Sequence, residues 1–94
     1  MVIGAMELRL RILGARSLKE KRKVLRSVKD RFSRMNISIS ETEDQDKWQA
    51  ATLGFAVVSN DANFINSILD KITLTFIDNS EIEILNNKIE IVHL

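Results

Sequence analysis

The chain contains no cysteine, no proline and no tyrosine, and it has a single histidine among 94 residues. Without cysteine it can form no disulfide, no thiolate metal site and no thiol nucleophile, and nothing favours an oxidising compartment. No apolar run approaches the roughly twenty residues that a membrane span requires. The first residues do not resemble a signal peptide, because Glu7 interrupts a short apolar run. We therefore expect a soluble cytoplasmic protein that has no membrane contact.

Residues that carry chemistry are sparse. His93 lies almost at the C-terminus, and no glycine-rich phosphate loop or second histidine accompanies it. A catalytic constellation cannot be assembled from this set, so we predict no catalytic residues, no cofactor and no enzyme activity. The acidic stretch at residues 41–46 offers oxygen ligands, but its spacing matches no calcium loop and it lacks the glycine that such loops use. A solvated acidic loop is the favoured interpretation, and no metal site is predicted.

Charge is divided unevenly along the chain, although the formal net charge is only +1. Residues 1–35 hold eleven basic and three acidic residues, a balance of +8, whereas residues 36–94 hold three basic and ten acidic residues, a balance of −7. Such asymmetry indicates an anionic partner for the first half, or self-association between unlike halves.

Hydrophobic periodicity predicts a strand, a helix, two strands, a second helix and a last strand. Residues 2–13 alternate as a long strand, and Ser17 with Glu20 forms a capping box before a helix that extends to about residue 35. Residues 37–40 and 48–59 are the next strands, and a second helix of uncertain length begins after Ser59, Asn60 and Asp61. In the last strand the apolar parity changes at Asn86 and Asn87, which predicts a bulge or a tight turn there.

With right-handed crossovers, this order of elements gives a single α+β domain over residues 1–94. We predict a ferredoxin-like sandwich (βαββαβ), in which a four-stranded antiparallel sheet carries both helices on one face. The first and third strands should be central, because they are long and the third is apolar on both faces.

Two stretches, GARSLKEKR at residues 14–22 and DQDKWQAATLGFAVVSND at residues 44–61, resemble the YlxP-like family of small bacterial domains of unknown function. The resemblance implies a ferredoxin-like fold. It also implies a genomic setting among translation and transcription genes, including a ribosome-maturation factor, and hence a ribosomal or RNA role. It carries no catalytic residues over to this chain.

The first helix is the leading candidate for a binding surface. Its apolar stripe would face the core, while a cluster of cations occupies the helix start, where the helix dipole already places about half a positive charge. Free backbone donors together with these cations form a candidate anion site, and RNA phosphate is the favoured anion. Lys21 is unusual because its helical angle points into the apolar stripe. The predicted nucleic-acid-binding residues are Arg16, Lys19, Lys21, Arg22, Lys23 and Arg26. The alternative is an ordinary solvated helix face.

Trp48 and Phe55 are the predicted interface residues. A tryptophan at a strand start could stack on a base, anchor a partner or cover the core, and packing or a subunit contact is favoured. Leu53, Phe55 and Val57 are expected on the sheet face away from the helices, beside Ala5, Glu7, Arg9 and Arg11. Such an apolar face, or a sheet edge, would suit a homodimer.

Three functions remain open. The favoured one is a small cytoplasmic accessory factor that binds ribosomal RNA or a ribosomal particle through the first helix. The second is a dimeric regulatory module that holds a small anionic ligand at the turn from Gly14 to Ser17. The third is a protein-interaction subunit with charged halves that serve assembly.

Overall fold

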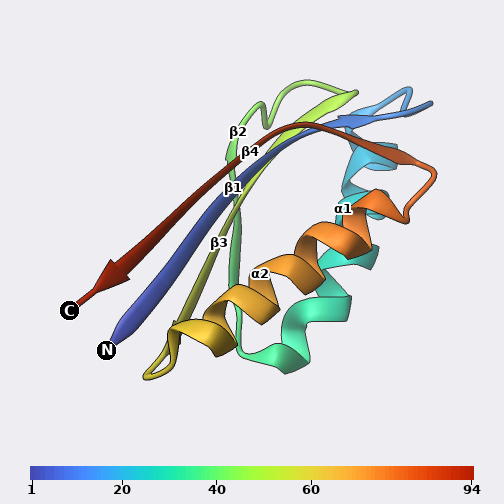
Figure 1. The fold of residues 1–94 in the computed structure, drawn as a ribbon. Helices are drawn as coiled ribbons and strands as arrows, with labels where there is room; N and C mark the ends of the chain where they lie inside the picture. The colour runs from blue at the N-terminus through green and yellow to red at the C-terminus, as the bar shows by residue number, and fades with distance from the viewer.

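Four antiparallel strands form one sheet, and both helices lie on the same face of it (Figure 1). The computed structural model describes all residues from 1 to 94. The elements in chain order are β1 (Val2–Ile12), α1 (Leu18–Phe32), the 3-10 turn η1 (Ser33–Met35), β2 (Ser38–Glu43), β3 (Ala50–Ser59), α2 (Ala62–Ile77) and β4 (Ile82–His93). The strand order is β2-β3-β1-β4, which confirms the predicted ferredoxin-like α+β fold with β1 and β3 in the centre. Neither helix combines the length and the apolarity needed to span a membrane.

The core lies between the helices and the inner face of the sheet. Large side chains of β1 and β3 meet the apolar stripes of both helices, and three phenylalanine rings join the layers. The ring of Phe32 in α1 lies 6.2 Å from those of Phe55 in β3 and Phe76 in α2, measured between centroids. Gly4 allows α2 to approach β1 closely, because a Cβ at that position would collide with Cγ2 of Ile65. The two helices are thereby fixed on the two central strands.

The prediction of which β3 side chains lie on the open face of the sheet is wrong. Opposite residues of an antiparallel ladder share a face, and Phe55 pairs with Met6 while Leu53 pairs with Leu8. Leu53, Phe55 and Val57 are therefore buried under the helices instead of lying on the open face. The small residues of β3, Gly54 and Ala56, take the open side. The large side chains turn toward the helices because only that side supplies partner atoms to fill the space around them.

The uncertain ends of the later elements are settled by the structure. Asp61 caps α2 by accepting a hydrogen bond from the Asn63 backbone N–H at 2.9 Å, and the helix then continues to Ile77. The alternating segment at residues 72–77 is thus helical. β4 is continuous, and the predicted irregularity is a bulge at Leu85, because Arg9 pairs with Asn86 while Leu10 pairs with Ile84. The irregularity, predicted at Asn86 and Asn87, thus lies just before them.

Candidate nucleic-acid interface

The start of α1 is built as the capping pattern predicted. Ser17 is the N-cap residue, and its Oγ accepts a hydrogen bond from the Glu20 backbone N–H at 3.1 Å. The Glu20 carboxylate turns back and accepts from the Arg16 backbone N–H at 2.5 Å, one residue before the usual position in a capping box. Glu20 is also the only acidic residue in the first turn of the helix.

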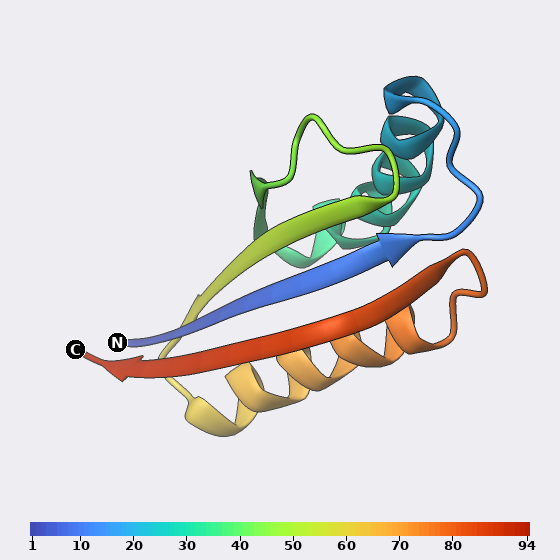
Figure 2. The same cartoon turned by 90° about the horizontal axis from the view of Figure 1, so that it is seen from above.

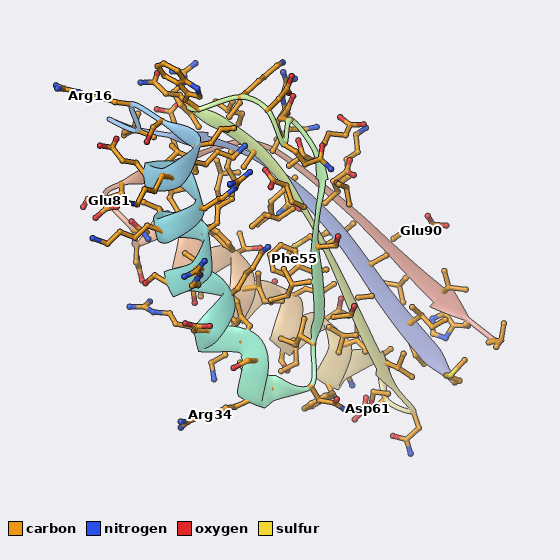
Figure 3. The ribbon with its side chains drawn as sticks, turned by 180° about the vertical axis from the view of Figure 1, so that it is seen from behind. Arg16, Arg34, Phe55, Asp61, Glu81 and Glu90 are labelled. Carbon is orange, nitrogen blue, oxygen red and sulfur yellow. The ribbon has the colours of Figure 1, made fainter.

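Five of the six predicted cations lie exposed around this helix start: Arg16, Lys19, Arg22, Lys23 and Arg26. None of the five has a carboxylate within 4 Å, since the ion pairs of the chain involve other cations. Their charges add to the positive end of the helix dipole, which costs roughly 0.3–1 kcal/mol for a cation in the first turn. Figure 3 labels Arg16 at this end of α1 and Arg34 at the opposite end. Lys19 in the first turn and Arg16 just before it therefore lie where the helix dipole disfavours positive charge.

The sixth cation, Lys21, does not belong to the binding surface. Its side chain is only 1% exposed, and its ammonium donates to the backbone carbonyls of Asp44 at 2.6 Å and Lys47 at 2.7 Å. The third partner is Oε2 of Glu41 at 2.8 Å. Two of the three ammonium donors are used by the carbonyls, and the charge is paired with the Glu41 carboxylate. The prediction that Lys21 contacts nucleic acid is corrected: this side chain joins α1 to the loop between β2 and β3.

Asp44 holds the same loop from its other side. It has a left-handed backbone conformation with φ of 64°, and its carboxylate accepts hydrogen bonds from Thr52 Oγ1 at 2.9 Å and pairs with Lys47 Nζ at 3.1 Å. The hydrogen bonds from Lys47 and then Thr52 lower the pKa of Asp44 from its ordinary value. Part of the acidic stretch thus binds cations and hydroxyls of the chain itself, and the loop has a defined shape.

The two sequence neighbours of Trp48 tie its loop to the start of α1 and to the end of β1. The Lys47 carbonyl is bonded to Lys21, and the Gln49 carbonyl accepts from the Ile12 backbone N–H at 2.8 Å. The Gln49 side chain donates to the Ala15 carbonyl at 3.1 Å, just before the start of α1. Trp48 precedes β3 and is 55% exposed. We infer that the anchored loop presents the indole to solvent at the same end of the molecule as Arg16.

The open face of the sheet has no aromatic side chain for base stacking. Phe55, predicted as an interface residue, is buried on the helix side. The centre of the open face is a shallow hollow of about 530 Å³ lined largely by small side chains, including Ala5, Ser40, Gly54 and Ala56. RNA recognition by stacking on a sheet surface requires exposed aromatics there. The aromatic contact available for a base is therefore Trp48 and not the sheet.

The turn that precedes α1 was the predicted location for a small anion. A shallow hollow of about 450 Å³ lies beside it and includes Gly14 and Lys23, but the same hollow is lined by Glu20 and Glu81. These two carboxylates oppose an anion in the hollow. The cations Arg22 and Arg26 are absent from its lining. The geometry thus offers an extended charged surface in preference to an enclosed pocket for a small ligand.

The comparison with known proteins agrees with the resemblance seen in the sequence. A family profile described as "Protein of unknown function (DUF503)" matches residues 3–89. The chain belongs to this family. It is also similar to the "Uncharacterized protein YlxP" of Bacillus subtilis (strain 168), with 42% identity over 78 residues that cover 82% of this chain and 84% of the relative. The predicted YlxP-like membership is confirmed.

Both stretches that carried the resemblance, residues 14–22 and 44–61, lie inside the residues matched by the DUF503 profile. In the fold they are one unit, because Lys21 of the first stretch binds two carbonyls of the second and Gln49 of the second binds Ala15 of the first. The exposed side chains of this unit include several cations and Trp48, together with the acidic Glu20 and Asp46. Sequence reasoning identified both groups separately and had no means of joining them.

Proposed function

We propose that this protein is a small cytoplasmic accessory factor that binds ribosomal RNA, or a ribonucleoprotein that contains it, through the start of α1 and the adjoining Trp48 loop. The observation that carries the proposal is the set of exposed cations without a carboxylate partner at the start of α1, to which hydrogen bonds tie the loop with the exposed indole. Phosphate contacts need positioned cations and no base-reading code. Stacking on a tryptophan is tolerant of sequence, because every base has a π-face.

The division of charge along the chain supports a binding surface on α1. The positive first half is concentrated on α1, and Arg31 and Arg34 continue along its exposed side. The proposed phosphate contacts lie at the start of α1, and Arg31 and Arg34 at its other end are outside them. The carboxylates in the hollow beside the turn favour this interpretation over the binding of a small anionic metabolite.

Two charge-matched variants test the proposal. In the first, Lys19, Arg22 and Lys23 are replaced by glutamate; in the second, Lys29, Arg31 and Arg34, at the other end of the same helix, are replaced by glutamate. Both changes alter net charge equally, so a difference between them reports position instead of total charge. We expect the first variant to lose co-sedimentation with ribosomal particles and the second to keep most of it.

Nuclease treatment separates the proposal from a purely protein-mediated role. The parent should leave the particle fraction when accessible RNA is digested, and its binding should weaken steeply between low and physiological salt. If the first glutamate variant co-sediments as well as the parent, the helix start is not the binding surface. If association survives nuclease and salt, the partner is a protein.

A further inference from the structure

The outer edge of β4 is unpaired over most of its length. β4 is the last strand in the order β2-β3-β1-β4, and Figure 2 shows it at the margin of the sheet with α2 alongside. It contains 12 residues with a bulge at Leu85, whereas the opposite edge strand, β2, contains only six and is also shifted in register. An exposed edge strand of this length is a template for pairing with another chain.

The hydrogen-bond pattern decides which residues of β4 offer their backbone to a partner. Met1 and Leu94 exchange two backbone hydrogen bonds, Leu94 N–H to Met1 O at 2.8 Å and Met1 N to Leu94 O at 3.2 Å. Hydrogen-bonded pairs recur at every second residue of an antiparallel ladder. Val92, Glu90 and Lys88 therefore direct their backbone groups toward β1. The alternate residues Asn87, Ile89 and Ile91 direct theirs outward.

The side chains along this edge do little to prevent pairing. The segment has no proline, and from Leu85 to Glu90 every side chain is exposed. Ile89 lies opposite Met6, on the helix side of the sheet, yet it is 51% exposed because no strand follows β4 on that side. The flanking charges, Lys88 and Glu90, are opposite in sign and both lie on the open face, since they pair with Glu7 and Ala5. This arrangement fits a partner with the same sequence.

We propose that β4 pairs with β4 of a second copy of this chain, antiparallel and centred on Ile89. The two copies would then form one continuous eight-stranded sheet. In this register Ile89 faces Ile89 of the second copy in a hydrogen-bonded pair, and Asn87 faces Ile91. Lys88 faces Glu90 of the second copy and Glu90 faces Lys88, in positions where opposed side chains are closest.

Charge selects this register over its neighbours. A pairing centred on Lys88 would place the two copies of Lys88 directly opposite each other, and a pairing centred on Glu90 would oppose the two copies of Glu90. Like charges directly opposite are destabilising, whereas opposite charges stabilise the pair. Only the register centred on Ile89 places each charge opposite its complement and also matches the outward-directed backbone groups.

The dimer has a consequence for the position of the helices. α2 accompanies β4 in Figure 2, so two copies of α2 would flank the new junction, and the two copies of Ile89 would be covered between them. Because the strands are antiparallel, the two basic helix starts would lie toward opposite ends of the joined sheet. The predicted homodimer is thereby assigned to a sheet edge and not to the open face, where small side chains predominate.

A charge-swap experiment tests the register. Sedimentation equilibrium of the purified full chain should show a monomer–dimer equilibrium for the parent. Either Lys88→Glu or Glu90→Lys alone should raise the dimer dissociation constant about tenfold or more, because each substitution creates two like-charge pairs. The double variant Lys88→Glu/Glu90→Lys should recover the parent value. A monomeric parent, or a double variant that dimerises no better than the single variants, would overturn the proposal.

Cysteine cross-linking provides an independent readout, because the chain has no cysteine of its own. In an Ile89→Cys variant the two Cα atoms would lie about 5.5 Å apart, within the range of a disulfide. In the control variant Val92→Cys they would lie about 20 Å apart along the antiparallel strands. Mild oxidation should yield a covalent dimer only for Ile89→Cys. Equal cross-linking of both variants, or of neither, would contradict the assigned register.

Discussion

Replacing Lys21 with methionine removes the link between α1 and the β2–β3 loop while keeping most of the side-chain volume. The Lys47 carbonyl loses its ammonium partner, and the Glu41 carboxylate, whose side chain is 18% exposed, loses its counter-charge. The Asp44 carbonyl keeps one hydrogen bond, from the Lys47 backbone N–H at 3.1 Å. The substitution thus leaves one carbonyl and one largely buried carboxylate without the partner that compensates their burial.

The magnitude follows from these two groups. An orphaned buried acceptor costs about 1–3 kcal/mol, and breaking a fully buried ion pair costs about 3–5 kcal/mol. Because Glu41 retains some contact with water, and because methionine buries well, we expect a loss of about 3 kcal/mol in the free energy of unfolding. For a domain of this size, that loss lowers Tm by roughly 12–24 °C.

Urea unfolding followed by circular dichroism measures this loss. Lys23→Met, the same chemical change at an exposed position two residues away, is the matched control and should remain within about 0.5 kcal/mol of the parent. Adding Glu41→Gln to Lys21→Met should recover part of the loss, because the uncompensated carboxylate is then gone. If Lys21→Met is as stable as the control but binds RNA poorly, Lys21 is a ligand-binding residue and the structural role assigned to it is wrong.

Three further predictions concern separate parts of the molecule. The pKa of Asp44 is lowered, so its carboxylate stabilises the fold above the unfolded-state pKa, and this contribution disappears as pH falls through the folded-state pKa. Asp44→Asn should therefore destabilise the protein more at pH 6 than at pH 2. Equal losses of unfolding free energy at both pH values in urea titrations would contradict the assignment. Gly4→Ala should lower the free energy of unfolding by about 1–3 kcal/mol, because its Cβ would collide with Ile65. A smaller loss in the Ile65→Ala background would verify that cause, and an equal loss would refute it. Trp48→Ala should weaken binding of single-stranded RNA by about 1–3 kcal/mol with little change in Tm, because the indole is exposed and would stack on a base. Unchanged affinity, measured by fluorescence anisotropy, would show that the indole does not contact the RNA.

The fold was largely predictable because apolar residues recur at a regular spacing in most of its elements. β1 alternates, α1 and α2 have apolar stripes at helical spacing, and the order of elements leaves few topologies. Which face of β3 meets the helices was not predictable, because apolar and polar residues do not alternate along a strand that is apolar on both sides. Only its pairing with β1, Phe55 opposite Met6, determines which residues meet the helices.

Six of the eight predicted residues remain members of the candidate site, whereas Lys21 and Phe55 are buried, and the arrangement of the site was not predictable. The helical angle of Lys21 indicated an inward-pointing lysine, but its acceptors are loop carbonyls at Asp44 and Lys47, far along the chain. Every residue has a backbone carbonyl, whatever its side chain, so sequence patterns cannot show which carbonyls accept hydrogen bonds from Lys21. Likewise the sequence around Trp48 indicates only the start of a strand, and the link from its loop to the start of α1 depends on the hydrogen bond from Gln49 to Ala15.

The central claim is that the cations at the start of α1 contact nucleic-acid phosphates. The most direct measurement is the salt dependence of RNA affinity, with Lys19, Arg22 and Lys23 replaced by glutamine in one variant and Lys29, Arg31 and Arg34 in the other. For a labelled single-stranded RNA, each lost phosphate contact should reduce the slope of log affinity against log salt by about 0.7. We predict a slope about two units shallower for the first variant and a slope close to that of the parent for the second. Equal slopes for the parent and the first variant would contradict the account.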